Sequence, residues 1–314
     1  MIIELHQETM SKVRLERVYK PNPGFVPIVV VDLRVHLCNI LSKYEEAEFK
    51  CKGDTEKLNT WVKACWAKLL NYPLPFMSHR SCRGYRLIIV DDTKADLPNG
   101  HNYWRNEECV RLGLEQYKGN RGGDSCKPEE YWKIYRSATD YFLGDGSDIG
   151  IFKEFSMEAD DMAGMVHRTV NELAEDQLHG FSCDAKGRDV FYWTIDGDWQ
   201  QLVDDKTSQL FHGTLGGQGL MSESEVLGFY MRKGTPITSP KEIARMKSIT
   251  GDLGDNLFPG SPISLFDLLD PPVKPSKTLK DLVRLELSKD SSNVSKEHYQ
   301  SALRWLSTNR LPCV

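Results

Sequence analysis

The chain has 314 residues, 40% of them hydrophobic and 10% aromatic, which predicts a folded protein with one large core or two smaller ones and excludes a disordered chain. The formal net charge of −5 is not typical of a general nucleic-acid binder, although acids gathered at a cation site would leave other faces basic. No apolar run is long enough to span a bilayer, no signal-peptide pattern is evident, and the eight cysteines form no Cys-x-x-Cys pair. These features predict a cytoplasmic protein with reduced thiols and no membrane partner.

Four short segments with apolar, mostly β-branched or aromatic residues are predicted as buried strands: 26–31, 86–90, 149–155 and 190–195. Each of them leads into carboxylates. These are Asp32 after the first segment, Asp91 and Asp92 after the second, Glu158, Asp160 and Asp161 after the third, and Asp196 and Asp198 after the fourth.

Helical patterns lie between and after these strands. The predicted helices cover 59–70, 128–142, a segment that begins at about Asp160 or Asp161, 222–232, 239–251, and a last helix that begins at Ser295. Ser222 and Ser239 each precede a glutamate by three residues, which is a capping-box pattern. A loop is expected after Asp92, with 98–100 as turn residues. Strands that alternate with helices predict an α/β fold with a mostly parallel central sheet flanked by helices.

The strand-end acids are expected to meet, because ligands of parallel sheets bind outside the carboxyl ends of the strands. Taken singly, each acid is better interpreted as a helix cap or a solvated charge, but four strands that end alike favour a shared site. Carboxylate ligands without histidine or cysteine indicate a hard cation such as Mg²⁺ or Mn²⁺. The seven acids, with Asp92 set aside, exceed the needs of one ion. Two ions would orient a water and stabilise the leaving oxygen of a phosphodiester.

Four runs of sequence, in order along the chain, resemble motifs of the 5′ nucleases. They are 117–121 (Tyr-Lys-Gly-Asn-Arg), 157–163 (Met-Glu-Ala-Asp-Asp-Met-Ala), 196–199 (Asp-Gly-Asp-Trp) and 250–256 (Thr-Gly-Asp-Leu-Gly-Asp-Asn). This group includes flap endonucleases, bacteriophage 5′-to-3′ exonucleases and phage ribonuclease H, and the phage flap endonucleases are the most similar. The resemblance implies a PIN-like 5′ nuclease core at 1–235 with a helical arch near 118–150. It also implies a helical DNA-binding region at 236–314 that contains a helix–three-turn–helix.

The resemblance implies roles for individual residues. The acids that would bind two divalent ions are Asp32, Asp91, Glu158, Asp160, Asp161, Asp196, Asp198, Asp252 and Asp255. Lys118 and Arg121 would act as catalytic cations on the scissile phosphate. The DNA contacts would come from Tyr117, Lys118, Arg121, Gly251, Gly254, Asn256 and Gly260. Family members often hold a K⁺ ion in the helix–three-turn–helix. Here the residues after Pro259 and Gly260 lack the usual further glycines and basic residue, which argues against that ion.

We therefore expect a Mg²⁺-dependent 5′-to-3′ exonuclease or flap endonuclease, active in DNA replication or repair and encoded by a phage. Its substrates would be DNA with a 5′ flap or 5′ end, and RNA primers in RNA–DNA hybrids. A replication polymerase or single-strand-binding protein would be its partner, and the protein would be a monomer. Two alternatives stay open at this point: a non-catalytic nucleic-acid-binding relative, and a PIN-type RNA nuclease, which normally lacks the segment 251–256. The choice between Asp91 and Asp92 as ligand, and the balance of exonuclease and flap activity, also stay open.

Overall fold

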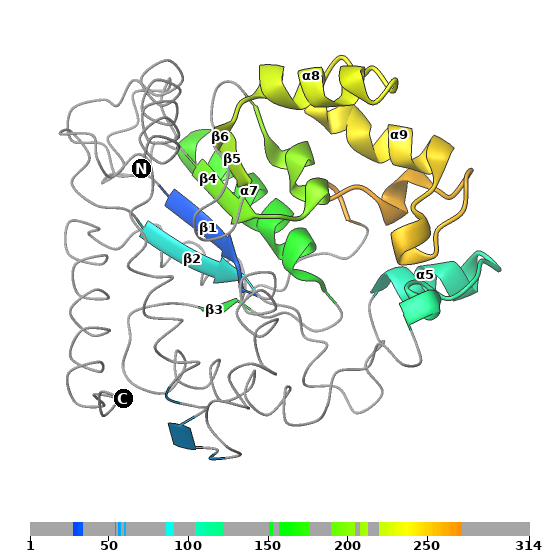
Figure 1. Ribbon diagram of the computed structural model, residues 1–314, viewed down its shortest axis with the longest axis horizontal. Helices are drawn as coiled ribbons and strands as arrows, with labels where there is room; N and C mark the ends of the chain where they lie inside the picture. Colours follow the sequence, from blue (N-terminus) through cyan, green and yellow to red (C-terminus); the bar gives the residue numbers. More distant parts are fainter. Residues whose placement is uncertain are drawn as a thin grey trace.

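One mixed sheet organises the part of the chain that the structure describes (Figure 1). The computed structural model describes residues 28–33, 54, 56–57, 60, 86–90, 104–121, 151–152, 157–175, 190–204, 208–212 and 220–271. The strands of the sheet are β1 (Ile28–Asp32), β2 (Arg86–Val90), β3 (Ile151–Phe152), β4 (Val190–Thr194), β5 (Ser208–His212) and β6 (Leu220–Met221). Their order across the sheet is β3-β2-β1-β4-β5-β6. Every neighbouring pair is parallel except β5 with β6, so the predicted α/β fold with a mostly parallel sheet is confirmed.

The register of the sheet places the ends of its central strands side by side. Val31 of β1 pairs with Ile89 of β2 and with Trp193 of β4, so Asp32 at the end of β1 lies level with the end of β4. β1 and β4 are buried throughout the residues whose side chains are described, which explains their unbroken apolar sequence. Of the predicted strand 149–155 only Ile151 and Phe152 are described, and both belong to β3.

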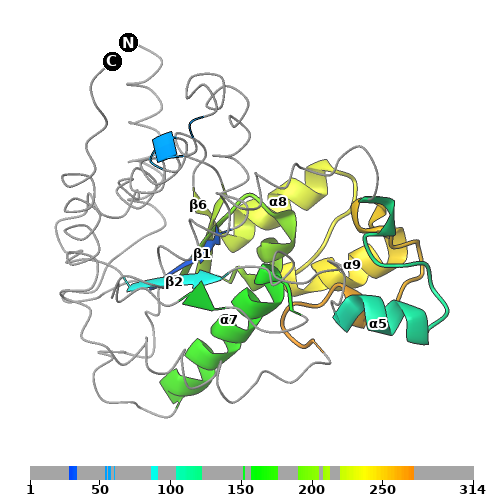
Figure 2. The same cartoon turned by 90° about the horizontal axis from the view of Figure 1, so that it is seen from below.

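Helices cover the sheet and continue away from it on one side (Figures 1 and 2). α7 (Ala159–Glu175) begins within two residues of its predicted start, and α8 (Glu223–Arg232) carries the predicted capping box at Ser222. The predicted helix 239–251 begins as a short 3₁₀ turn, η5 (Pro240–Glu242), continues as α9 (Ile243–Thr250) and ends at Gly251. The predicted helices 59–70 and 128–142 and the one at Ser295 lie largely or wholly outside the described residues, as do Asp91, Asp92 and most of the predicted arch.

One prediction in this region is wrong. The segment after Asp92, expected to be a loop, contains α5 (Trp104–Arg111). This helix has an acid in its first turn and an arginine in its last turn, but a helix of 8 residues is too short to be stable by itself. Trp104, Arg105 and Cys109 are buried, so packing against distant residues stabilises the helix and local sequence preference does not reveal it.

Two hydrophobic clusters form the described core. The larger one joins the sheet to α7, α8 and η4 (Gly197–Leu202), and it includes Val30, Met162, Tyr192, Trp199 and Ile243. The second cluster joins α5 to the segment after α9, and its members are Trp104, Cys109, Tyr117, Ala244, Leu257, Leu265 and Phe266. Neighbouring residues of α9 thus enter different clusters, and Figure 2 shows α5 beside α9 and away from the sheet.

The segment that follows α9 returns to the core, where its backbone lies in close contact with α7 and η4. A Cβ atom on Gly164 of α7 would lie 1.8 Å from the carbonyl oxygen of Leu268, so only glycine allows this approach. Gln201 Nε2 donates to the carbonyl of Phe266 at 2.8 Å, and Arg168 donates to that of Leu269 at 2.6 Å. These contacts hold residues 265–270 against α7 and η4. The predicted boundary between 1–235 and 236–314 stays a prediction. Within the described residues, no helix is both long and apolar enough to cross a membrane.

Candidate metal site

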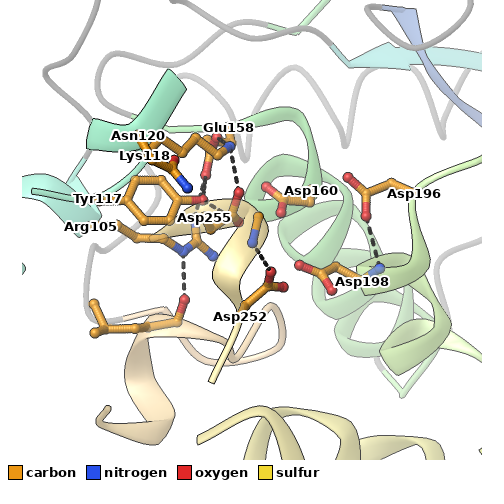
Figure 3. A network of polar contacts seen from close by, with 12 residues as sticks. Arg105, Tyr117, Lys118, Asn120, Glu158, Asp160, Asp196, Asp198, Asp252 and Asp255 are labelled. Carbon is orange, nitrogen blue, oxygen red and sulfur yellow. Dashed lines mark hydrogen bonds and ion pairs between the residues drawn. The ribbon is translucent and has the colours of Figure 1, made fainter. Parts of the chain in front are cut away.

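Acidic side chains from three separate segments lie together beyond the carboxyl ends of β1 and β4 (Figure 3). They form two groups, each with carboxylate oxygens within 4.8 Å of one another. The first group is Glu158, Asp160 and Asp161 at the start of α7; the second is Asp198, Asp252 and Asp255. Asp196, which is the N-cap of η4, lies beside them in Figure 3, near Asp160 of the first group and Asp198 of the second.

Local structure explains how the acids after β4 reach this place. Asp196 follows β4 and caps η4, because its side chain accepts a hydrogen bond from the backbone N–H of Asp198 at 2.9 Å. Its own N–H donates to Thr194 Oγ1 at 2.9 Å, and that hydroxyl donates to Asp32 Oδ2 at 3.0 Å. A short chain of hydrogen bonds therefore ties the buried Asp32 of β1 to the turn that carries Asp196 and Asp198.

Arg105 holds the first group of acids and was not identified from the sequence. Its Nη1 and Nη2 donate to the two oxygens of Asp161 at 2.6 and 2.7 Å, and Nη1 also lies 3.2 Å from Glu158 Oε2. Trp104 Nε1 and the backbone N–H of Glu158 also donate to Asp161 Oδ2, at 3.0 and 3.2 Å. Arg105 Nε donates to the carbonyl of Leu265 at 2.8 Å. Both oxygens of Asp161, a predicted metal ligand, are therefore engaged by donors of the protein.

The Arg105–Asp161 pair is fully buried, with side-chain exposures of 2% and 0%. Burial alone would lower the pKa of Arg105, but the charges of Asp161 and then Asp160 raise it well above its ordinary value. Arg105 is therefore a permanent positive charge inside the site. It compensates one carboxylate of three in the first group and allows the others to lie close together.

Tyr117 and Lys118 connect the first group to the second. The Tyr117 hydroxyl lies 2.5 Å from Glu158 Oε2 and 3.1 Å from Asp255 Oδ2. The Lys118 ammonium donates to Glu158 Oε1 and lies 4.0 Å from Asp255 Oδ1. Burial would raise the pKa of Glu158, but Lys118 and Arg105 overcome this effect and lower it to about 2. Glu158 is therefore ionised and ready to act as an oxygen ligand at neutral pH.

Lys247 of α9 lies within the second group and was likewise missed. Its ammonium donates to Asp198 Oδ1 and, at 2.6 Å, to Asp252 Oδ2. Burial would lower the pKa of Lys247, but the two aspartates raise it. The amphipathic pattern of 239–251 gives no signal for this role. The partners of Lys247 become its neighbours only when α9 packs against η4 and the chain turns back after Gly251.

Asp160 and Asp196 differ from the other acids. Among the described residues, no lysine or arginine forms an ion pair with either of them. Burial raises the pKa of Asp160 well above its ordinary value, and the charges of Asp161, Glu158 and Asp196 add to this effect against that of Arg105. Loss of hydration, and then the charge of Asp198, raises the pKa of Asp196 to about 6. Nearby positive charges act on the two carboxylates only from beyond ion-pair distance in this part of the chain: Arg105 on Asp160, and Lys247 and Lys118 on Asp196.

The donor set fits hard divalent cations. Every ligand atom in the two groups is a carboxylate oxygen, which suits Mg²⁺ or Mn²⁺ and not a soft metal. Burial first, and the charges of neighbouring acids second, raise the pKa of Asp160 and of Asp196, and a cation bound beside these carboxylates would favour their ionised form. Asp32 contacts Thr194 at the same edge, whereas the position of Asp91 lies outside the described residues.

The predicted DNA-binding glycines lie in the turns after α9. Gly251 ends α9 with a φ of 75°, and a Cβ atom there would lie 2.7 Å from the carbonyl oxygen of Leu257. Gly254 lies in η6 (Leu253–Asp255), where its N–H donates to Asp252 Oδ1 at 3.0 Å. Gly260 has a φ of 87° and open space around it. Close approach of the backbone to a ligand is therefore sterically open at Gly260, whereas Gly251 serves the turn.

Residues 115–121, which contain the motif 117–121, dock against the same turns. Lys118 N donates to the carbonyl of Asp255 at 2.8 Å, and Asn120 Nδ2 donates to that of Leu253 at 2.8 Å. Asn256 Nδ2 donates to the carbonyl of Gln116 at 3.0 Å. Lys118 and Asn256 both have a positive φ, of 56° and 60°. The amide of Asn256, a predicted DNA contact, is thus used inside the protein. Of Arg121 only the backbone is described, in η3 (Gly119–Arg121).

Comparisons with known proteins give matches only among solved structures. No protein-family model and no curated protein matches the chain. A structure of the bacteriophage T5 D15 protein co-crystallized with metal ions has a TM-score of 0.45 and 16% identity, and covers 88% of this chain and 98% of that one. The T5 D15 flap endonuclease in a pseudo-enzyme–product complex with DNA and metal ions has a TM-score of 0.44 and 15% identity, with the same coverage.

A third structure, the T5 5′-exonuclease with bound zinc, has a TM-score of 0.43 and 16% identity, and again covers 88% of this chain and 98% of that one. These solved structures are of 5′ nucleases, the same family that the sequence motifs resemble.

Proposed function

We propose that this chain is a metal-dependent 5′ nuclease that hydrolyses phosphodiesters at 5′ flaps or 5′ ends of DNA, with RNA–DNA hybrids as further substrates. The observation that carries the proposal is the meeting of two carboxylate groups from separate segments at one edge of the sheet, with Lys118 and Tyr117 between them. Acid-only clusters with adjacent cations suit phosphoryl chemistry, because negative charge must be neutralised around the reacting phosphate.

Two divalent ions, with Mg²⁺ as the expected cation and Mn²⁺ as a substitute, would be held by Glu158, Asp160 and Asp196 on one side and by Asp198, Asp252 and Asp255 on the other, and Asp32 and Asp91 would complete the set. Bound there, they would supply a water of lowered pKa and positive charge at the phosphate. Asp161 belongs to the site as the partner of Arg105, which fixes the start of α7. The other contributions to the reaction would come from side chains of the protein.

Lys118 is placed to bring a positive charge to the phosphate. Its side chain is 13% exposed and forms an ion pair with Glu158, so a movement of the ammonium away from Glu158 would bring it to a phosphate bound beside the acid groups. The Tyr117 hydroxyl keeps Glu158 and Asp255 at a fixed separation. Arg121 is proposed as the second phosphate contact on the basis of the motif alone. The turns around Gly254 and Gly260 would approach duplex phosphates at close range, which positions DNA without reading its sequence. The N–H groups of these two glycines donate within the protein, to Asp252 and to the carbonyl of Ser248, so the phosphate donors would be other groups of the turns.

The proposal is tested with a 5′-flap DNA that carries a label at its 5′ end. Asp160→Asn and Asp198→Asn should each reduce Mg²⁺-dependent cleavage by about a hundredfold or more, because each removes a charged ligand of the ions. Filter binding in Ca²⁺ should show that the variants still bind the flap. Glu107→Gln, which removes an exposed acid on α5, is the matched control and should cleave as the wild-type protein does.

Product sizes decide between flap cutting and exonuclease digestion, and a labelled RNA–DNA hybrid tests the second substrate class. Cleavage at the wild-type rate by a double Asp160→Asn, Asp198→Asn variant would rule out the proposed site. A wild-type protein that binds the flap but does not cleave it would leave the non-catalytic relative as the better description.

A further inference from the structure

Lys247 fills the place between two of the three acids in the second group. Its ammonium contacts Asp198 and Asp252, and the carboxylate oxygens of these two residues and Asp255 lie within 4.8 Å of one another. The side chains of Lys247 and Asp198 are each 17% exposed, and that of Asp252 is 25% exposed. This arrangement is therefore not an ordinary surface ion pair, in which both partners are largely solvated.

The backbone builds this contact. Gly251 turns the chain after α9, its N–H donates to the carbonyl of Lys247 at 2.6 Å, and Asp252 and Leu257 then pair across the turn at 2.7 and 2.9 Å. Any side chain at Gly251 would meet the backbone of 257–259 at less than 3.0 Å. Asp252 follows Lys247 by five residues in the sequence, and this turn places the Asp252 carboxylate directly against the Lys247 ammonium. The other partner, Asp198, belongs to η4, which α9 contacts.

The two parts of the candidate site therefore differ. Asp160 and Asp196 have no lysine or arginine partner among the described residues, whereas Asp198 and Asp252 share one ammonium. A lysine ammonium is a compact point charge on a flexible four-carbon stem, and it uses the same carboxylate oxygens that a divalent ion would use. An ion and the ammonium cannot both occupy the space between Asp198 and Asp252.

We propose that Lys247 is the resident cation of the second acidic group, and that a divalent ion enters this group only by displacing the Lys247 ammonium. The inference rests on the proposed function, because it concerns one of the two ion positions named there. It assigns Lys247 as a positioning residue that keeps Asp198 and Asp252 together before the ion arrives. Because the ion must displace the ammonium, the second acidic group should bind a divalent ion more weakly than the same carboxylates would without Lys247.

The first experiment is a titration of the full chain with Ca²⁺ by calorimetry, without nucleic acid. Lys247→Met keeps the apolar stem and removes the charge, so the weaker of the two Ca²⁺ sites should bind roughly tenfold more tightly, within the usual range for coupled sites. Arg245→Met removes an exposed charge from the same helix and should leave both affinities unchanged. Adding Asp252→Asn to the Lys247→Met variant should abolish the tightened site, which places that site in the second group.

A second measurement uses the wild-type protein and does not depend on the fold of a variant. In protein labelled with ¹³C-lysine, the ε-CH₂ signal of Lys247, assigned with Lys247→Arg, should move toward that of a solvated lysine as Ca²⁺ is added. Equal Ca²⁺ affinities in Lys247→Met and wild-type protein, or an unmoved signal at saturating Ca²⁺, would overturn the inference and leave the proposed function standing. If none of these proteins binds Ca²⁺, the inference and the proposed function both fall.

Discussion

Arg105→Met is the substitution that most directly tests how the acids at the start of α7 are held. Arg105 makes four hydrogen bonds from a 2% exposed side chain, and two of them form a bidentate pair with the fully buried Asp161. Methionine fills similar space but leaves a buried carboxylate without its cation. Removing one partner of such a pair costs about 3–5 kcal/mol of unfolding free energy. We expect a loss in that range.

Urea unfolding in EDTA, followed by tryptophan fluorescence, measures this loss without stabilisation by bound ions. The control is Arg111→Met on the same helix. Arg111 pairs with Glu108 from a 67% exposed side chain, so its loss should change the free energy of unfolding by less than about 0.5 kcal/mol. Adding Asp161→Asn to Arg105→Met removes the stranded charge and should recover at least about 1 kcal/mol. A single Arg105→Met variant within about 1 kcal/mol of wild type, or strict additivity in the double variant, would refute the reasoning.

Two further predictions concern stability away from the acids. Burial lowers the pKa of His167 to about 4, from an ordinary value of 6.5, so the unfolded chain binds the proton more readily and the free energy of unfolding falls as the pH drops from 6.5 toward 4. Between pH 7.5 and 5.5, the free energy of unfolding measured by urea titration should fall by about 1.4 kcal/mol more in the wild-type protein than in His167→Gln. An equal fall in the two proteins would show that His167 does not cause this pH dependence. Gly164→Ala should lower the free energy of unfolding by about 1–3 kcal/mol, because its methyl group would overlap the carbonyl of Leu268. Gly228→Ala on α8, where the added atom would meet only the flexible end of Arg232 at 3.5 Å, should be neutral or stabilising in the same assay.

The features that local sequence determines could be predicted. β1, β2 and β4 each contain four consecutive apolar residues, at 28–31, 87–90 and 190–193, and such runs are typical of the strands of a parallel sheet. Ser222 and Gly251 mark helix ends through hydrogen bonds and backbone angles that involve only nearby residues. β5 was missed because Ser208–His212 mixes polar and apolar residues, and β6 because a two-residue strand leaves no pattern.

The cations of the site could not be predicted, because their partners are far away in the sequence. Arg105 pairs with Asp161 across 56 residues, and Lys247 meets Asp198 across 49. Nothing in the residues around Arg105 or Lys247 distinguishes these side chains from ordinary surface charges. The acids were found because several strands end alike, and that regularity does not exist for the residues that balance their charge.

The docking of residues 115–121 onto the turns at 252–256 has a practical consequence for engineering. Each partner supplies side-chain amides and backbone groups to the other through Asn120, Asn256 and the N–H of Lys118. Grafting one of these two segments from a related protein would leave its counterpart with unmatched donors and acceptors. Chimeras meant to alter substrate preference should therefore exchange both segments as a single cassette.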